Sequence, residues 1–379
     1  MSGKKLTLFV VAGEASGDLH AANLVKALRK EYADGEIEFF GSAGPRMREA
    51  GVEPVVWADD LAIIGLAEIG MALPQFLKAF IALKRSVREM KPDAAILVDF
   101  PDFNLKLVKW LKKRGIKVVY YISPQLWAWR SYRVRMIKKY VDLMITILPF
   151  EKVWYASKDF INLEYVGHPL ATEVHSGSTK ADFCKRHGLN CESPVIALLP
   201  GSRLKEVTRI LPNMLAASRR IAVDRPDVQF VIAATNEASA STIRAMGRDG
   251  KTIVVGETHD ALNAADAAAV ASGTATLEAA IIGTPMVVVY KTSVINYTLL
   301  RPLISVEHFG LVNLIAGKRI AKELIQGDLT PGNLASELLR LLDPAENAKA
   351  RTELASAVQK LGDGGASKRA AEAVLSVLS

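Results

Sequence analysis

The stretch AAILVDFPDFNLKLVKWLKKRGIKVVYYI, residues 94–122, contains two short apolar runs with a helical pattern between them. The runs 94–100 and 118–122 are apolar at almost every position, which is typical of strands in a parallel sheet covered by helices on both faces. Residues 105–113 have the apolar spacing of a helix. The stretch therefore predicts a strand–helix–strand unit of an α/β protein.

The same alternation continues in both directions along the chain. We expect further strands in the first half at residues 6–12, 37–41, 143–148 and 163–166, and a helix at 19–32. After a polar stretch at 168–194, strands are expected at residues 195–199, 228–233, 252–255, 267–271 and 286–290. This order predicts two Rossmann-like, doubly wound α/β domains that face a central cleft. Their expected bounds are 1–170 and 171–350, and 351–379 is expected to be a C-terminal helix able to pack back on the first domain.

The composition narrows the class of protein. The chain has 379 residues, enough for two domains, and half of them are hydrophobic. The apolar run at 6–12 is too short for a signal peptide, and no stretch reaches the roughly 18 apolar residues that cross a bilayer. The net charge of +8 is spread along the chain without a basic tail, which favours phosphorylated or membrane partners over nucleic acid. We expect a protein that is soluble or peripheral to a membrane, on the cytosolic side.

Several familiar site motifs are missing from the sequence. Neither half contains a G-x-G-x-x-G or a G-x-x-x-x-G-K-[ST] loop, which disfavours dinucleotide oxidoreductases and P-loop NTPases. Cys184 and Cys191 have the spacing of neither a disulfide framework nor a metal knuckle, so we expect two reduced thiols. Asp59-Asp60 lacks the spacer of a D-x-D signature. We therefore expect neither a metal nor a cofactor.

The apolar run at 6–12 ends in Gly13-Glu14-Ala15-Ser16-Gly17-Asp18 and leads into the helix expected at 19–32. Glycines permit close approach of the backbone, and amides at the start of a helix can bind an anion or sugar oxygens. The candidate binding residues here are Glu14, Ser16, Gly17 and His20. The alternative is ordinary helix capping by Ser16 or Asp18.

Two carboxylates follow the strand expected at 94–100, in Asp99-Phe100-Pro101-Asp102-Phe103-Asn104. The carboxyl end of a parallel strand is where α/β enzymes keep reactive groups, and a carboxylate there can accept the proton of an attacking hydroxyl. Asp99 is the candidate base because it ends a buried strand, with binding of loop amides as the alternative. Asp102 is expected to cap the next helix, and His20 is the competing base.

The loop Ser123-Pro124-Gln125-Leu126-Trp127-Ala128-Trp129-Arg130 follows the strand expected at 118–122. Trp127 suits a sugar face or an acyl chain, and Arg130 suits a phosphate, whereas interdomain packing is the alternative for the tryptophans. His168, which precedes Pro169, is expected to be structural.

Two loops of the second half are candidate phosphate-binding sites. In Leu199-Pro200-Gly201-Ser202-Arg203, a glycine turn enters a helix, so that Gly201, Ser202 and Arg203 suit a phosphate. The stretch SGTATLE joins a strand to a helix, and its small residues admit a diphosphate; the candidates are Ser272, Gly273, Thr274, Ala275, Thr276 and Glu278. Glu278, one turn into the helix, can accept both ribose hydroxyls, with a capping-box role as the alternative.

Residues 61–91 are a candidate membrane surface. They have few charges before Lys78, and a helix starting at Pro74 would place Leu77, Phe80, Ile81 and Lys84 on one face. Apolar residues edged by basic ones suit a surface resting on anionic lipid. The expected membrane patch is Leu66, Ile69, Leu73 and Leu77, and an interior helix of the first domain is the alternative.

Taken in order, these loops resemble the lipid-A-disaccharide synthase family, which has the GT-B glycosyltransferase fold. The matching pieces lie between residues 11 and 317 and are VAGEASGD, GSAGPRM, VDFPDFN, YYISPQLWAWR, ILPFEKVWY, YVGHPL, LLPGSR, ASGTATLE and LVNLIAG. By position, Asp99 resembles the family's essential carboxylate, Arg203 its phosphate-side arginine and Asn313 the amide of its PNLLAG-like segment. Here Val312 stands in place of the proline of that segment.

The resemblance implies a reaction. UDP-2,3-diacylglucosamine would donate its sugar to 2,3-diacylglucosamine 1-phosphate, giving a β-1,6 disaccharide 1-phosphate and UDP with inversion at the anomeric carbon. The resemblance also implies that Asp99, Arg203 and Asn313 serve catalysis, that no metal is used, and that the enzyme works at the cytosolic surface of the inner membrane of a Gram-negative bacterium.

Two other functions share part of this pattern. A UDP-N-acetylglucosamine 2-epimerase would have the same fold and a comparable diphosphate loop, but it would release no UDP as a net product. A non-catalytic UDP-sugar-binding membrane protein would not need Asp99 in a loop at the end of a strand. Assays of UDP release and product mass separate the three.

Overall fold

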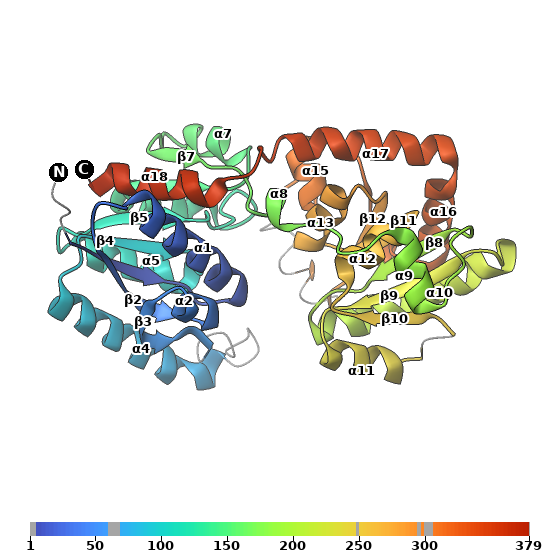
Figure 1. The fold of residues 1–379 in the computed structure, drawn as a ribbon, viewed down its shortest axis with the longest axis horizontal. Coiled ribbons are helices and arrows are strands. Elements are labelled where there is room, and N and C mark those ends of the chain that lie inside the picture. Colours follow the sequence, from blue (N-terminus) through green and yellow to red (C-terminus); the bar gives the residue numbers. More distant parts are fainter. Residues whose placement is uncertain (1–4, 60–68, 248–249, 294–296, 299–305, 379) are drawn as a thin grey trace. The chain divides into compact units, whose positions relative to one another are not determined.

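A computed structural model describes residues 5–59, 69–247, 250–293, 297–298 and 306–378. The chain forms two compact units (Figure 1). The N-terminal unit comprises Met1–Pro169 and Asp363–Ser379, and the C-terminal unit comprises Leu170–Gly362. Among the described residues, no helix is both long and apolar enough to span a bilayer.

The N-terminal unit is built on a parallel sheet of seven strands in the order β3-β2-β1-β4-β5-β6-β7. The strands are β1 (Leu6–Val11), β2 (Ile37–Ala43), β3 (Val52–Trp57), β4 (Ala94–Val98), β5 (Lys117–Tyr121), β6 (Leu143–Thr146) and β7 (Leu163–Tyr165). The helices are α1 (Ala15–Glu31), α2 (Pro45–Glu49), α4 (Ile69–Met90), α5 (Pro101–Lys112), α6 (Val134–Tyr140), α7 (Glu151–Ala156) and α18 (Ala366–Leu378), with a short η1 (Ser131–Arg133).

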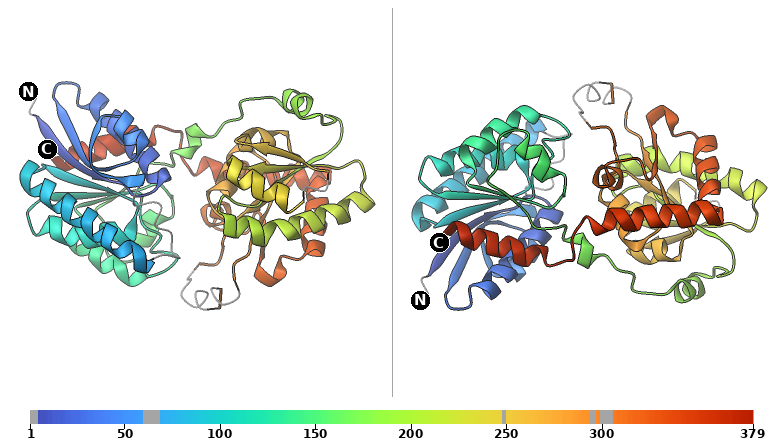
Figure 2. Two further views of the ribbon diagram at one scale, coloured as in Figure 1. Left: turned by 90° about the horizontal axis from the view of Figure 1, so that it is seen from below. Right: turned by 90° about the horizontal axis from the view of Figure 1, so that it is seen from above.

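Helices cover both faces of this sheet. Phe9 and Val11 of β1 share a core with Leu83 of α4 and Leu107 of α5. On the other face, α1 packs along α18, which brings the C-terminal end of the chain into this unit (Figure 2). Because both faces are covered, β4 is buried at every position, as its apolar sequence predicted.

The C-terminal unit has a parallel sheet of six strands in the order β10-β9-β8-β11-β12-β13. The strands are β8 (Val195–Leu199), β9 (Gln229–Ala234), β10 (Thr252–Val255), β11 (Ala267–Ala271), β12 (Met286–Tyr290) and β13 (Lys322–Ile325). The helices are α8 (Leu170–Glu173), α9 (Lys180–His187), α10 (Leu204–Asp224), α11 (Glu237–Ala245), α12 (Thr258–Ala264), α13 (Thr274–Ile282), α15 (Leu311–Ala316), α16 (Pro331–Leu342) and α17 (Pro344–Gln359), with a short η3 (Gln326–Asp328).

The structure confirms two parallel-sheet α/β units and corrects three details. The strands β3 and β13 were not predicted; both are edge strands, and Glu53 and Pro54 interrupt the apolar pattern of β3. The single helix expected at 351–379 is wrong: α17 ends in the C-terminal unit and α18 begins in the N-terminal unit. Between them Gly362, Gly364 and Gly365 have φ angles of 86°, 85° and 70°, which break the helix. Finally, α4 begins at Ile69 rather than Pro74, which lies inside it.

Candidate active site

The strand order of each sheet reverses at one point. In the N-terminal unit the reversal lies between β1 and β4, and in the C-terminal unit it lies between β8 and β11. Loops that leave two strands in opposite directions open a crevice at the carboxyl edge of the sheet, where α/β proteins bind ligands. Four predicted motifs follow these four strands: GEASGD after β1, DFPDFN after β4, PGSR after β8 and SGTAT after β11.

Asp99 is held in an uncommon backbone conformation directly after β4. Its φ is 45°, and that of Phe100 is 49°, so two consecutive non-glycine residues are left-handed. Such residues persist only where the surrounding structure holds them. The Asp99 amide donates to the Tyr121 carbonyl at 3.0 Å, and its carbonyl accepts from Asn104 Nδ2 at 2.8 Å and from the Tyr120 hydroxyl at 2.7 Å. These bonds fix the position of Asp99.

The environment of Asp99 suits a general base. Burial and, to a lesser extent, the charge of Glu14 raise the pKa of Asp99 to about 6. A carboxylate with this pKa is mostly ionised at neutral pH and is a stronger proton acceptor than an ordinary aspartate. His20, the competing base, has its pKa lowered by burial to about 4, so it accepts a proton less readily than Asp99.

The loops after β1 and β4 meet at Gly13. A Cβ atom added there would lie 2.3 Å from the Phe100 ring, so only glycine fits. Glu14 is the N-cap residue of α1 but makes no side-chain cap, and Ser16 and Gly17 lie in the first turn. The capping alternative for Asp18 is wrong for this helix: its carboxylate instead accepts from the amides of Arg46 and Met47 at 2.9 and 3.1 Å, at the start of α2.

Two histidines of the predicted set lie near one another: His168 is buried, and His20 is half-buried. His20 Nδ1 is buried and has no hydrogen-bond partner in the part of the chain that the structure describes. Burial, together with a smaller effect of the nearby His20, lowers the pKa of His168 to about 4. Both imidazoles are therefore neutral at physiological pH.

The loop at 123–130 is held mainly by its own unit. Trp127 is 7% exposed and packs edge-on against Phe150, with ring centroids 4.9 Å apart. Arg130 donates to the Asp102 carboxylate at 3.2 Å, and Arg133 donates to the same oxygen at 2.7 Å. The prediction that Asp102 caps α5 is therefore wrong, because the N-cap of that helix is Phe100 and Asp102 pairs with arginines.

The two glycine-containing loops of the C-terminal unit follow the neighbouring strands β8 and β11. They place backbone amides and the Arg203 side chain at the carboxyl ends of these strands. Gly201 has φ 110° and Gly273 has φ 147°, conformations that favour glycine. The helices that follow, α10 and α13, begin without a side-chain cap, at N-cap residues Arg203 and Gly273. The Arg203 side chain is 80% exposed, with Glu206 at 3.4 Å as a surface partner. Ser202, Gly273 and Thr274 are exposed, Ser272 and Ala275 are half-buried, and Thr276 is buried and donates to the Gly273 carbonyl at 2.8 Å.

Glu278 lines an open cavity of about 380 Å³ in the C-terminal unit. The lining residues are His175, Gly177, Thr235, Gly256, Glu257, Thr258, His259, Asp260 and Glu278. Glu278 Oε2 lies 3.4 Å from His259 Nε2, and this contact raises the pKa of His259. The carboxylate therefore faces a cavity and pairs with a histidine of α12.

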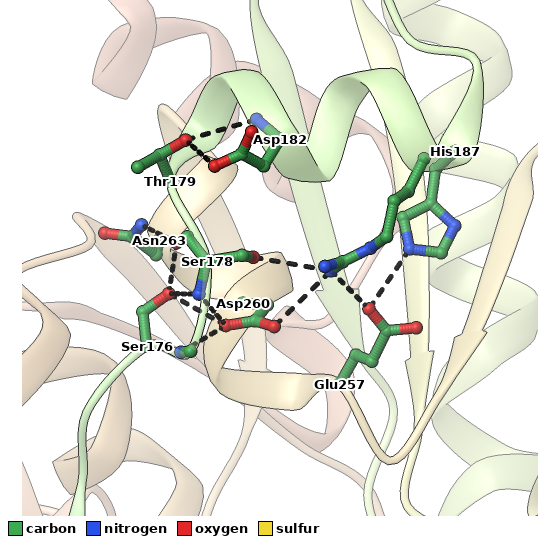
Figure 3. Close-up of polar contacts among 10 residues, drawn as sticks. Ser176, Ser178, Thr179, Asp182, His187, Glu257, Asp260 and Asn263 are labelled. Atoms are coloured by element: carbon green, nitrogen blue, oxygen red, sulfur yellow. Dashed lines mark hydrogen bonds and ion pairs between the residues drawn. The ribbon is translucent and has the colours of Figure 1, made fainter.

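A polar network beside this cavity fixes the segment that precedes α9 (Figure 3). The Asp260 carboxylate accepts from the Ser176 hydroxyl at 2.8 Å and from the amides of Gly177 and Ser178 at 2.7 and 3.1 Å. Arg186 of α9 donates to Glu257 at 2.7 Å. The HSGSTK stretch is polar because Ser176, Gly177 and Ser178 donate hydrogen bonds to Asp260 of α12. These bonds attach the stretch to that helix.

Asn313 is fully buried, and its amide is occupied within the protein. Its Nδ2 donates to the Ala321 carbonyl and to Glu323, each at 2.8 Å, and its Oδ1 accepts from the amides of Ile320 and Ala321 at 2.9 Å. Glu323 also accepts from the Gly310 amide at 2.9 Å. The neighbouring Phe309 carbonyl accepts from the Ser272 hydroxyl at 2.8 Å. These bonds connect Asn313 to Ser272 of the SGTAT loop through Glu323 and the backbone at Phe309 and Gly310.

The predicted membrane patch is described only in part. Leu66 lies outside the described residues, and for Ile69 and Leu73 only the backbone is described. Leu77 and Ile81 are 57% and 58% exposed. Phe80 packs against Phe103 at 5.5 Å between centroids, so it does not share a fully exposed face with the other two.

Three residues of this site were not identified from the sequence. Tyr120 and Glu323 lie inside strands, and Glu151 lies at the start of α7, so each resembles an ordinary position of its element. A carboxylate among apolar residues, in LPFEKVW or KELI, is the signal that points to a buried polar role. Among the described residues, no group of three or more His, Cys, Asp or Glu is arranged to hold a metal ion.

Solved structures of low sequence identity share this fold. A UDP-GlcNAc 2-epimerase from Neisseria meningitidis, bound to UDP-GlcNAc, has a TM-score of 0.64 at 14% identity, covering 98% of this chain and 99% of the epimerase. CalG4, the calicheamicin glycosyltransferase, has a TM-score of 0.59 at 16% identity, covering 99% and 98%. Two parallel-sheet units with loops at their switch points are thus the GT-B fold of glycosyltransferases and epimerases.

Sequence comparisons identify the family within this class. The family model for lipid-A-disaccharide synthetase matches residues 8–377. Lipid-A-disaccharide synthases from Syntrophus aciditrophicus and Myxococcus xanthus are 45% and 44% identical, covering 99% and 98% of this chain and 98% and 97% of theirs. The chain belongs to the lipid-A-disaccharide synthetase family, whose enzymes are UDP-sugar-dependent glycosyltransferases that form the lipid A disaccharide on a lipid acceptor. The resemblance found in the sequence is confirmed.

Proposed function

We propose that the enzyme transfers 2,3-diacylglucosamine from UDP to 2,3-diacylglucosamine 1-phosphate, giving the β-1,6 disaccharide 1-phosphate and UDP with inversion. The observation that carries the mechanism is Asp99 at the switch point of the N-terminal sheet: its backbone is held by hydrogen bonds, and the pKa of its carboxylate is raised to about 6. The exposed Arg203 follows β8, one of the two strands at the switch point of the C-terminal sheet.

In the proposed step, the acceptor's primary hydroxyl loses its proton to Asp99 as its oxygen bonds to the anomeric carbon. The bond from that carbon to the diphosphate oxygen breaks, and UDP carries away the electron pair. Arg203 and the uncapped amides at the starts of α10 and α13 stabilise the negative charge on the diphosphate. A single displacement of this kind inverts the anomeric centre without a covalent sugar–enzyme intermediate.

Glu278 is proposed to bind the two ribose hydroxyls of the donor. Its carboxylate lines the cavity of about 380 Å³, and hydrogen bonds from hydroxyls to a carboxylate are stronger than neutral ones. Gly201, Ser202, Ser272, Gly273, Thr274, Ala275 and Thr276 complete the proposed diphosphate side. Asn313 is proposed to act through the loop that it holds, because its own amide is saturated.

The N-terminal unit is proposed to carry the acceptor and to rest on the cytosolic face of the inner membrane. Glu14, Ser16, Gly17, His20, Trp127 and Arg130 are its proposed acceptor-side residues. Exposed Leu77 and Ile81 on α4, with Leu66, Ile69 and Leu73 before them, form the proposed membrane patch. Lys78, Arg85 and Arg88 on the same helix supply the positive charge that anionic lipid attracts.

One assay tests this function against its rivals. The purified protein is incubated with the UDP-diacylglucosamine donor, with and without the acylated glucosamine 1-phosphate acceptor. The proposal expects UDP release that depends on acceptor, together with a product of disaccharide mass. Conversion of the donor's sugar without acceptor would indicate an epimerase, and binding without turnover would indicate a non-catalytic protein.

A further inference from the structure

Glu151 is a buried carboxylate that the proposed mechanism does not use. It lies at the start of α7, within the ILPFEKVWY motif, and is 1% exposed. Its Oε1 accepts from Trp127 Nε1 at 3.1 Å, and its Oε2 accepts from the Leu148 amide at 3.2 Å. Both donors are neutral. Burying an ionised carboxylate among neutral partners costs free energy of folding, which points to a role other than stability.

The loop at 123–130 needs anchors of this kind. It is flanked by Ile122 and Arg130, whose φ angles are 63° and 55°. A left-handed β-branched residue is a strained conformation that the surroundings must maintain. The loop lies between these two strained points, so its shape depends on contacts with other elements.

Helix α7 provides two such contacts. Glu151 binds the Trp127 indole, and the Tyr155 hydroxyl pairs with the Ser123 hydroxyl at 2.9 Å, one turn farther along the helix. The first contact holds the middle of the loop and the second holds its start. The loop then continues to Arg130, which reaches Asp102, three residues beyond Asp99.

We propose that Glu151 is a positioning residue that sets the shape of the loop at 123–130 for the acceptor sugar phosphate. The inference rests on the proposed function, which assigns this loop to the acceptor. Glu151 does not touch the substrate in this account. It acts by holding Trp127, and through the loop it places Arg130 beside the site of Asp99.

The protonation of Glu151 gives this role a signature in pH. Burial raises the pKa of Glu151 to about 7. The ionised carboxylate accepts hydrogen bonds from both Trp127 Nε1 and the Leu148 amide. The protonated carboxyl places an O–H group against one of these N–H donors and loses that bond. The loop is therefore held best above pH 7. The groups facing Glu151 are Trp127 and Ser123 of the loop, the Ile147 and Leu148 amides, Tyr155 of α7 and Tyr165 of β7.

Stability should change with pH in the opposite direction. Because the folded-state pKa of about 7 lies above the ordinary 4.5, Glu151 contributes stability that is present below pH 4.5 and is lost as the pH rises through about 7. If Glu151 only supported the fold, activity and stability would both fall as the pH rises through about 7. If Glu151 positions the loop, the acceptor KM should instead improve over this range while the stability falls.

The test compares Glu151→Gln with Lys152→Gln, a matched removal of charge at the next, exposed position of α7. We expect Glu151→Gln to raise the acceptor KM about tenfold at pH 8, the effect of losing one charge-assisted hydrogen bond, with the donor KM unchanged. Hydrogen–deuterium exchange of a peptide covering 123–130 should become faster in this variant alone. The pH dependence of the acceptor KM near 7 should disappear, and stability at pH 8 should not fall.

An unchanged acceptor KM with unchanged exchange at 123–130 would overturn the proposal, as would a general acceleration of exchange across the unit. If Glu151→Gln unfolds the protein, Trp127→Phe replaces it: that variant removes the donor to Glu151 and should give the same local exchange. The exchange measurement needs no turnover. Failure of the proposed function would therefore appear in the Asp99 variants, while failure of this inference would appear in the loop.

Discussion

The Tyr120 hydroxyl donates a hydrogen bond to the main-chain carbonyl of Asp99 at 2.7 Å. Tyr120 belongs to β5 and is fully buried, so the bond joins the interior of the sheet to the loop after β4. Tyr120 and Asn104 both donate to the main-chain carbonyl of Asp99 and so hold this residue in its left-handed conformation. Neither of them bonds to its carboxylate in these contacts, although the position of that carboxylate depends on both residues.

Replacing Tyr120 by phenylalanine should disturb the alignment of the Asp99 carboxylate without removing the carboxylate itself. The change removes one of two donors to the Asp99 carbonyl, which should cost about 1 kcal/mol of stability. We expect kcat to fall about tenfold because the carboxylate loses its alignment, with the affinity for UDP unchanged. Steady-state kinetics and calorimetric titration with UDP measure both. Tyr140→Phe, a hydroxyl deletion on α6, is the control, and equal losses in the two variants would argue against a specific role.

Donor binding should depend on Glu278. Glu278→Ala is expected to weaken UDP binding by about 1–3 kcal/mol, because charge-assisted hydrogen bonds to the ribose are lost. Calorimetric titration with UDP measures the change, and Glu237→Ala, an exposed carboxylate on α11, is the control. Unchanged affinity would mean that Glu278 serves only His259, its partner at 3.4 Å.

Asn313 should be important for stability. Asn313→Ala leaves the amides of Ile320 and Ala321 without their acceptor, and Glu323 loses one donor. We expect a loss of about 1–3 kcal/mol in the free energy of unfolding, measured by chemical denaturation. The control Asn333→Ala, an exposed amide at the start of α16, should cost less. A fully stable but inactive Asn313→Ala protein would instead indicate direct contact with substrate.

Membrane binding should depend on the outer face of α4. The double change of Leu77 and Ile81 to serine is expected to reduce pelleting with vesicles of anionic lipid while the melting temperature is kept, because both side chains are more than half exposed. Leu83→Ser, which alters a fully buried residue of the same helix, should instead destabilise the protein by about 2–5 kcal/mol. Undiminished pelleting of the double variant would place the membrane surface elsewhere.

The sequence predicted those features that depend on local pattern. Strands such as β4 and β11 are apolar throughout because helices cover both faces of each sheet, and their bounds were predicted within two residues. The loops at the switch points were identified because glycines and polar residues interrupt the pattern at the carboxyl ends of strands. The break between α17 and α18 was missed although the sequence Asp363-Gly364-Gly365 carries its signal.

Features that depend on distant contacts were not predictable in this way. Asp102 has the position of a helix cap, but Arg130 and Arg133, about thirty residues later, bind it instead. Asp18 likewise caps α2 rather than its own helix. The roles of Glu151 and Glu323 arise from tertiary hydrogen bonds, which no local pattern specifies. The edge strands β3 and β13 were missed because partial burial weakens their apolar pattern.

The most direct measurement is the turnover of Asp99→Asn, with His20→Ala beside it. Asparagine keeps the shape of the side chain but cannot accept the acceptor's proton, so we expect kcat to fall about 10²–10⁴-fold with the affinity for UDP nearly intact. In the parent, kcat/KM should rise as the pH increases through about 6, where Asp99 ionises. Because its pKa is raised from 3.8, the parent should lose stability relative to Asp99→Asn over the same range. Turnover of Asp99→Asn within about tenfold of the parent, with His20→Ala inactive, would contradict the account and make His20 the base.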